Sequence, residues 1–188
     1  MMENWLNLPW LEFPKSEWDD ILDENICPVC KSDDWASPKG SASSDILLVG
    51  YAPDEDVIRN NAIYPLNVQT MLRNEFAVMG LDYNSMRKTN LWIHLDNKND
   101  ACLQYGLQML IKEARGKKYV LLMGSDTVKY ITKQDVGSIN GLCVTSPYLS
   151  APHIMAMINP NNVFGGTVGE VRLSIFKFSQ KILAGENK

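Results

Sequence analysis

The sequence has few cysteines, few histidines and no surplus of positive charge. It contains 4 Cys and 2 His, and its 18 Lys and Arg are outnumbered by 22 Asp and Glu, for a net charge of −4. This balance argues against a protein that coats nucleic acid through phosphate contacts alone. It remains compatible with an enzyme whose pocket contacts a few phosphates locally.

Long apolar runs are also missing. No stretch approaches the roughly 20 apolar residues that a membrane span requires. The first five residues, Met1 to Trp5, lack the basic and apolar regions of a signal peptide. We therefore expect a soluble, cytoplasmic protein whose thiols stay reduced. The hydrophobic share of 45% and the length of 188 residues suit a single domain with a small appendage.

From Asp45 onward, strand-like apolar runs alternate with helix-like patterns. The strand-like runs are 46–49, 91–93, 119–123, 142–144 and 154–158. The helical patterns are 66–79, 101–114, a segment opening after Gly124, and 167–183. This alternation predicts an α/β fold with a mostly parallel sheet covered on both faces. We divide the chain into an arm with a cysteine knuckle and linker (1–44) and an α/β domain (45–188).

Ligands of such sheets bind beyond the carboxyl ends of the strands. The polar segments that follow the predicted strands are therefore the places to look for chemistry. They are 51–56, 94–96, 124–126 and 159–162.

The first 44 residues hold three of the five tryptophans, Trp5, Trp10 and Trp18. We expect these rings to pack the arm onto the domain. The alternative is an arm that binds a protein partner.

Cys27 and Cys30 form a CxxC pair that precedes the first predicted strand. A redox pair of the thioredoxin type would follow that strand at a helix N-terminus, so a metal knuckle is favoured. His94 ends a predicted strand and Cys102 opens the next helix, which places both at one edge of the sheet. A Cys₃His set suits tetrahedral zinc, and it suits an iron–sulfur cluster with one histidine ligand equally well.

A purely structural alternative is a surface CxxC, a loop histidine and a buried Cys102 that never meet. Cys143 and His153 lie inside apolar strand-like runs, and we expect both to be core residues.

Six short motifs occur in an order that resembles the uracil-DNA glycosylase superfamily, most closely its family-4 branch, which carries a [4Fe–4S] cluster. They are GYAPDED (50–56), TNLWIH (89–94), AC (101–102), VLLMGSDTV (120–128), INGL (139–142) and MINPNNVF (157–164). The likeness covers roughly residues 25–180. It implies a three-layer α/β/α fold around a central, mostly parallel four-stranded sheet.

The resemblance also implies a ligand set. In the family, an N-terminal CxxC, a cysteine after the TNxxK strand and a cysteine at the start of the next helix hold the cluster. Here the matching residues are Cys27, Cys30, His94 and Cys102. Because histidine replaces the third cysteine and the following loop is shorter, both a [4Fe–4S] cluster and Zn²⁺ stay open.

The family's active-site positions carry over in part. Tyr51 stands where the family usually has a glutamate, while Asp54 and Glu55 follow in the same loop as candidate carboxylates. Tyr64 matches the aromatic residue that stacks on the flipped base. Asn90 matches the asparagine that reads the uracil edge.

The late HPxxL motif becomes Asn-Pro here, so Asn159 replaces its histidine, as in the mismatch-specific branch of the superfamily. Val163 or Phe164 would be an apolar wedge that fills the vacated base stack. Base excision needs a carboxylate near the oxocarbenium-like sugar and neutral donors near the anionic leaving base, roles that suit Asp54 or Glu55 and Asn159.

The resemblance therefore predicts a DNA glycosylase that flips and excises uracil or a related deaminated base from single- or double-stranded DNA. Because two family residues are replaced, the alternative is a catalytically degenerate DNA-binding or polymerase-accessory module. A weaker possibility is a small-molecule nucleobase or nucleotide enzyme. Each residue also has a plain structural role open to it: Asn90 at a strand end, Tyr64 in packing, the acidic run and the Asn-Pro segment in turns.

Overall fold

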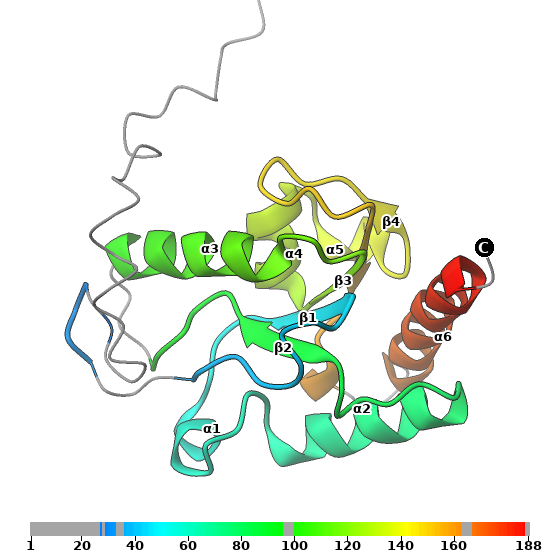
Figure 1. The fold of residues 1–188 in the computed structure, drawn as a ribbon, viewed down its shortest axis with the longest axis horizontal. Helices are drawn as coiled ribbons and strands as arrows, with labels where there is room; N and C mark the ends of the chain where they lie inside the picture. Colours follow the sequence, from blue (N-terminus) through cyan, green and yellow to red (C-terminus); the bar gives the residue numbers. More distant parts are fainter. Residues whose placement is uncertain (1–26, 28, 33–35, 96–99, 163–166, 187–188) are drawn as a thin grey trace, which may run out of the picture.

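The computed structural model describes residues 27, 29–32, 36–95, 100–162 and 167–186 (Figure 1). Its helices and strands alternate along the chain. They are β1 (Ile46–Gly50), α1 (Glu55–Arg59), α2 (Leu66–Val78), β2 (Arg87–Asn90), α3 (Asp100–Ala114), β3 (Tyr119–Met123), α4 (Ser125–Thr132), α5 (Val136–Ile139), β4 (Cys143–Val144), β5 (His153–Met157), the 3₁₀ turn η1 (Pro160–Asn162) and α6 (Thr167–Glu186). The predicted tryptophan arm lies outside the described residues.

The described strands form one sheet in the order β2-β1-β3-β5-β4. The first four strands in this order are parallel, and β4 runs antiparallel to β5. The predicted mostly parallel α/β sheet is confirmed, but the expected count of four strands is wrong. The fifth strand is the two-residue β4, which pairs Cys143 with Met155 and Val144 with Ile154.

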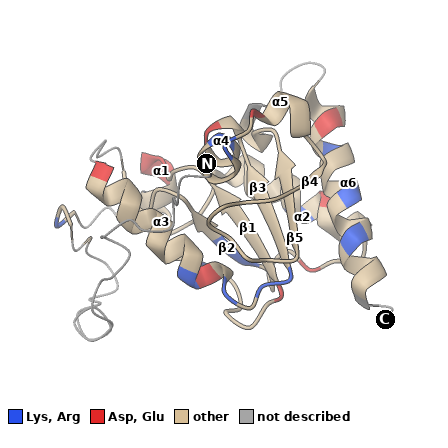
Figure 2. Cartoon of the chain, turned by 90° about the horizontal axis from the view of Figure 1, so that it is seen from above, with Lys and Arg blue, Asp and Glu red and all other residues tan. Residues whose placement is uncertain are grey.

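Helices cover both faces of the sheet (Figure 1). Alternate residues of each strand point to opposite faces. Leu48 and Leu121 therefore join α2 and α6 in one hydrophobic cluster, while Leu47 and Leu122 join α3, α4 and α5 in the other. Figure 2 shows that most charged residues lie on helices and connecting loops; within the sheet, Arg87 and Lys88 of β2 are charged.

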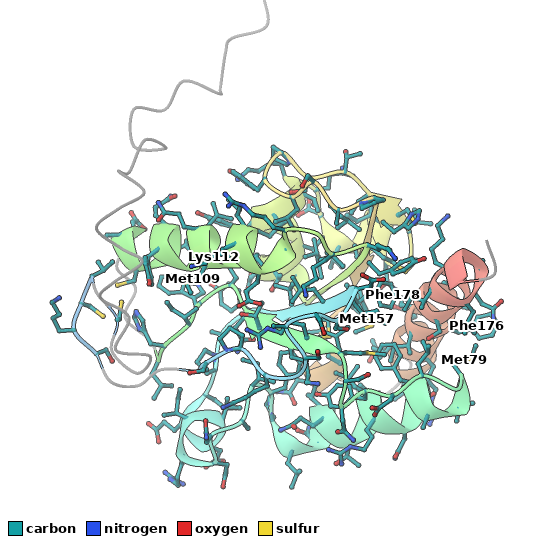
Figure 3. All side chains as sticks on the ribbon, in the orientation of Figure 1. Met79, Met109, Lys112, Met157, Phe176 and Phe178 are labelled. Carbon is teal, nitrogen blue, oxygen red and sulfur yellow. The ribbon has the colours of Figure 1, made fainter. Side chains whose placement is uncertain are left out.

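The layer of α2 and α6 is closed by aromatic packing. The rings of Phe76 and Phe178 meet edge to face with their centroids 6.4 Å apart. Phe178 and Met157 are buried between α6 and the sheet, whereas Phe176 remains 49% exposed on the outer side of α6 (Figure 3). Phe176, Val78 and Leu173 together form exposed apolar surface where α2 and α6 meet.

The second strand begins earlier than the apolar pattern predicts. Its residues are Arg87–Asn90, and the run Leu91-Trp92-Ile93 follows it. The polar strand is stable because its backbone pairs with β1 and its side chains find internal partners. Leu91 and Trp92 only continue the pairing, donating their backbone N–H groups to Gly50 and Tyr51.

Two further expectations are corrected. Cys143 is exposed, because β4 is a short strand at the edge of the sheet. His153 is half-buried at the start of β5, where its ring stacks on Tyr119 with a centroid distance of 5.2 Å. Neither residue is part of the hydrophobic core.

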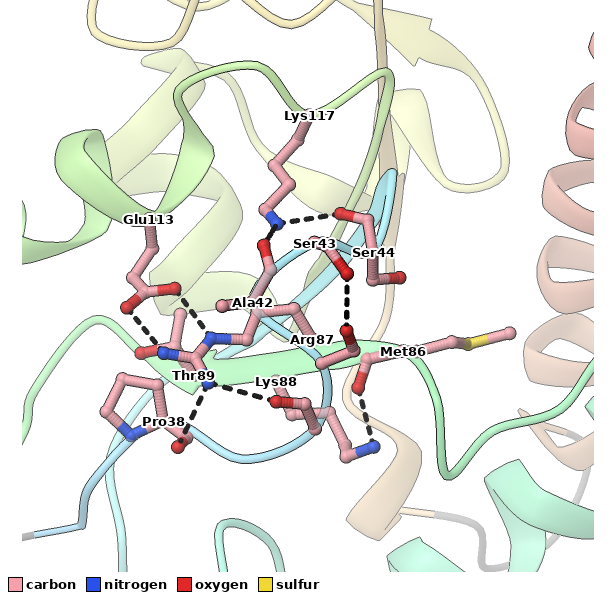
Figure 4. A network of polar contacts seen from close by, with 12 residues as sticks. Pro38, Ala42, Ser43, Ser44, Met86, Arg87, Lys88, Thr89, Glu113 and Lys117 are labelled. Carbon is pink, nitrogen blue, oxygen red and sulfur yellow. Dashed lines mark hydrogen bonds and ion pairs between the residues drawn. The ribbon is translucent and has the colours of Figure 1, made fainter.

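The segment expected to be a linker is held against the domain. Lys39 pairs with Lys88 in an antiparallel bridge at the edge of β2. Arg87 donates to the carbonyls of Pro38 and Gly40, and Lys117 donates to those of Ala42 and Ser44 (Figure 4). Residues 36–44 therefore extend the domain. None of the described helices combines the length and apolarity needed to cross a bilayer.

Candidate functional site

Four side chains from three separate segments converge beside the edge strand β2. Their potential ligand atoms, three cysteine sulfurs and one ring nitrogen, all lie within 4.8 Å of one another; the residues are Cys27, Cys30, His94 and Cys102. Cys30 is half-buried and the other three are fully buried. The predicted convergence is confirmed, and these residues can hold a metal.

The knuckle that carries the first two ligands is a tight turn. Lys31 donates its backbone N–H to the carbonyl of Cys27 at 2.8 Å, and Cys27 donates its own to Ser32 at 2.8 Å. Lys31 has a φ of 61°, a left-handed conformation that costs roughly 1–2 kcal/mol for a residue with a side chain. The turn sends both sulfurs to the same side.

His94 is oriented by its own neighbour in the chain. Its Nδ1 lies 3.1 Å from the carbonyl oxygen of Leu95, which can only accept, so Nδ1 carries the proton. The unprotonated Nε2 lies 3.5 Å from Sγ of Cys30. This is the pattern of histidine ligands in proteins, where a carbonyl fixes the tautomer and leaves the other nitrogen for the metal.

Cys102 comes from the first turn of α3. Burial, then the neighbouring thiol of Cys30 and the charge of Cys27, raise its pKa to about 12. Burial and the charge of Cys27 also raise the pKa of Tyr105, one turn further along α3. Without a cation the Cys102 thiol therefore keeps its proton, and binding of a divalent metal supplies the charge that releases it.

The residues matched to base recognition lie together at the carboxyl ends of β1 and β2. Tyr64 is 4% exposed and donates its hydroxyl to the carbonyls of Leu48 at 2.7 Å and Thr89 at 3.1 Å. Burial raises the pKa of this phenol well above its usual value. A side chain on Gly50 would collide with Oδ1 of Asn90 and with the Tyr64 ring, so these three residues form one tightly packed group.

The amide of Asn90 is only half satisfied. Its Nδ2 donates to the carbonyl of Ile63 at 2.9 Å. Because a carbonyl accepts and cannot donate, this contact assigns the other amide atom as oxygen. That Oδ1 is buried and has no hydrogen-bond partner among the described residues. An unsatisfied buried acceptor costs about 1–3 kcal/mol.

The carboxylate candidates are exposed and hold local structure. Asp54 caps α1 by accepting the backbone N–H of Val57 at 2.8 Å, and Glu55 follows in the first turn. Asn159 accepts the backbone N–H of Asn161 at 2.9 Å. Within the described part of the chain, no hydrogen bond joins these three side chains to Asn90 or Tyr64. Val163 and Phe164 lie outside the described residues.

Tyr51 belongs to a different feature of the same edge. It is 42% exposed and contributes to a cavity of about 460 Å³ between α3 and α4. The lining residues are Tyr51, Leu103, Asp126, Lys129, Tyr130 and Lys133. The sequence pattern had not singled out Lys129 and Tyr130 of α4, or Lys133, the residue that follows this helix. The available signal was the three-residue spacing of Tyr130 and Lys133 in the segment after β3, which brings the Lys133 ammonium to 4.8 Å from the centre of the Tyr130 ring.

No protein-family model matches the chain, and no curated protein matches its sequence.

Proposed function

We propose that the chain is a DNA glycosylase resembling the uracil-DNA glycosylase superfamily, that it excises uracil or a related deaminated base, and that its Cys₃His site holds a structural metal centre. The observation that carries the proposal is the unsatisfied acceptor of Asn90 at the carboxyl edge of the sheet. The resemblance supports the proposal, because its motifs assign the other candidate residues to loops that would line this edge.

An unpaired amide oxygen matches the chemistry that distinguishes deaminated bases. Uracil carries N–H at the centre of its Watson–Crick edge, where cytosine carries a bare nitrogen. Hypoxanthine differs from adenine in the same way. A buried acceptor gains a hydrogen bond from the deaminated base and faces a lone pair of the normal one. Oδ1 of Asn90 is such an acceptor.

The adjacent aromatic ring supports the same role. Tyr64 lies against Gly50 and Asn90, and its hydroxyl is anchored by two strand carbonyls. An aromatic ring provides a flat face on which a base can stack, whichever group it carries at the hydroxyl position. Extruding that base from the helix costs a few kcal/mol, which stacking and edge contacts must offset. The vacated stack would be filled by Val163 or Phe164.

The bond-breaking step needs opposite charges at the two ends of the glycosidic bond. Asp54 or Glu55 would stabilise positive charge on the sugar and orient a water, and Asn159 would donate to the anionic base. Asp54 uses Oδ1 to cap α1, which leaves its second carboxylate oxygen for this work.

A second candidate function is base recognition without excision, in a DNA-binding or polymerase-accessory module. The observation that favours it is the local use of the catalytic candidates. Asp54 caps a helix, the Asn159 side chain closes a turn, and Tyr51 replaces the usual acidic residue. Recognition through Asn90 is common to both functions, so one experiment can separate them.

Excision is tested with single- and double-stranded oligonucleotides that contain one uracil, hypoxanthine, cytosine or thymine, followed by alkaline cleavage of abasic sites. We expect product from a deaminated base and none from cytosine. The variant Asn90→Ala should lose about 100-fold in single-turnover rate, the size of effect seen when one key hydrogen bond to the reacting group is removed. Asn74→Ala, on the exposed face of α2, is the matched control.

The outcomes are distinct. Absence of abasic product from every base, with enzyme in excess of DNA, overturns the glycosylase. Tighter binding of the uracil oligonucleotide that depends on Asn90, without product, establishes the recognition module instead. Equal binding of all oligonucleotides by wild type and Asn90→Ala overturns both.

A further inference from the structure

We propose that the Cys₃His site takes a single tetrahedral zinc ion and not the iron–sulfur cluster that the resemblance implies. This inference rests on the metal-centre part of the proposed function and is independent of base excision, because it concerns only the four Cys and His residues and their spacing. It identifies the ion of the structural metal centre.

The distances between ligand atoms decide the size of the group they can hold. A zinc ion with Zn–S bonds of about 2.3 Å and a Zn–N bond of about 2.0 Å spaces its ligands about 3.8 Å apart for two sulfurs and about 3.5 Å apart for sulfur and nitrogen. Here no two of the four ligand atoms are more than 4.8 Å apart. Sγ of Cys30 and Nε2 of His94 lie 3.5 Å apart, the spacing of two ligands on one ion.

A [4Fe–4S] cluster needs its four ligands further apart than a zinc ion does. Its outer ligands bind different irons, and the inorganic sulfides lie between them, so ligand atoms on different irons are about 6 Å apart. To fit a cubane, every pair of ligands here would have to separate by more than 1 Å. The ligands come from a tight turn, the loop after β2 and the first turn of α3. Such an expansion would require these backbone segments to move apart.

The packing of α3 opposes that movement. Gly106 lies against the backbone of Leu91. Gly106 is one helical turn after Cys102, and Leu91 is three residues before His94. Ala36, six residues after Cys30, donates its backbone N–H to Ile93 at 2.7 Å, next to His94. The contact between Gly106 and Leu91 holds the segments of His94 and Cys102 together, and the Ala36 bond keeps that residue beside the same loop.

The donor set agrees with zinc and predicts a closed site. Three thiolates and one neutral imidazole form one of the standard ligand sets of structural zinc, with no position left for water or substrate. His94 presents Nε2 because Nδ1 donates to Leu95. Zinc has no redox chemistry, so the site joins the knuckle to β2 and α3 without taking part in electron transfer.

The composition of the wild-type protein tests the inference without any assay of activity. The full chain is expressed with iron and zinc both supplied, purified without oxygen, and analysed for metals and acid-labile sulfide. We expect colourless protein with about one zinc per chain and no sulfide. Replacement by Co²⁺ should give the intense visible bands of a tetrahedral cobalt thiolate. Brown protein with several irons and sulfide per chain, or protein that binds neither metal, overturns the proposal.

Matched substitutions locate the ion. Cys102→Ser and His94→Ala should weaken zinc binding by about 100-fold or more in competition with a chelator. Cys143→Ser and His153→Ala alter the chain's remaining cysteine and histidine and should leave it unchanged. If the ligand variants do not fold, removal of the ion from wild type by a chelator should lower the thermal midpoint. Zinc alone, without iron and sulfide, should restore it; recovery only with iron and sulfide contradicts the proposal.

Discussion

The α-carbon of Gly106 in α3 lies directly against the carbonyl oxygen of Leu91, which follows β2. A methyl group on Gly106 would overlap that oxygen, so only glycine permits the contact. Cys102 lies one turn earlier on the same helix, and His94 lies three residues after Leu91. This approach of helix and loop therefore sets the distance between two ligands of the metal site.

Gly106→Ala should push α3 away from Leu91. We expect a loss of about 1–3 kcal/mol in the free energy of unfolding, the usual cost of overpacking. Because Cys102 moves with the helix, zinc affinity should fall by about 10-fold or more, as it does when the orientation of metal ligands is disturbed. Urea unfolding and chelator competition measure the two effects.

Gly169→Ala is the matched control for that substitution. Gly169 also lies in a helix, α6, and a methyl group there would meet no atom within 4 Å. The variant should be unchanged or more stable by up to about 1 kcal/mol, because alanine favours helix. Equal destabilisation of both variants would show that the contact with Leu91 is not the cause.

The ion pair between Arg87 and Glu113 should contribute more to stability than a surface pair. Two bonds of 2.7 Å join the guanidinium to the carboxylate, and both side chains are more than 80% buried, being 16% and 17% exposed (Figure 4). Arg87→Lys removes the paired geometry and should cost about 1–2 kcal/mol in urea unfolding. Arg59→Lys, whose pair with Asp56 is exposed, should change stability by less than about 0.5 kcal/mol. Similar losses in both would contradict this view.

Lys88 should make stability depend on pH above neutrality. Its ammonium donates to three backbone carbonyls and lies 4.3 Å from the Tyr83 ring, yet burial lowers its pKa to about 8. In the unfolded chain the pKa is about 10.4, so between these values the unfolded state holds more protons. Stability contributed by this group therefore rises as pH increases from about 8 to 10.

The measurement is urea unfolding at pH 7.5 and 9.5 in wild type and Lys88→Met. We expect the stability difference, wild type minus variant, to increase by on the order of 1 kcal/mol at the higher pH. Lys181→Met, at an exposed position of α6, should show no such change relative to wild type. A difference that stays constant or decreases with pH would contradict the expected direction.

Tyr64→Phe separates the ring of this residue from its hydroxyl. Loss of the bonds to Leu48 and Thr89 should cost about 1–2 kcal/mol in unfolding free energy. The ring remains, so excision or base binding should change less than about threefold if stacking is its role. Tyr83→Phe is the control, because that buried hydroxyl has no partner among the described residues and its removal should not destabilise. Loss of function in Tyr64→Phe at full stability would rule out a role limited to stacking.

The sequence by itself determined most of the helices, most of the strands and the four residues of the candidate metal site. The run 119–123 is strand β3, and the helical pattern that begins at Leu66 is α2. These two predictions are confirmed because burial of one face imposes an apolar period of 2 residues on a strand and 3.6 residues on a helix. The four residues could be identified because the CxxC pair precedes the first predicted strand, while His94 and Cys102 lie together at one edge of the predicted sheet.

Other features depend on contacts between elements, which the apolar periodicity of the sequence does not predict. The polar strand Arg87–Asn90 is buried although it has no apolar pattern. Lys88 donates to the carbonyls of Tyr83, Asn84 and Met86 just before it, and Asn90 donates to the distant Ile63. The unsatisfied oxygen of Asn90 and the exposure of Cys143 also depend on which elements adjoin them. The spacing that favours one zinc ion over a cluster is likewise tertiary. It is set by how closely α3 packs on the loop after β2. The sequence pattern of a helix or of a loop predicts that element but not the distance between the two.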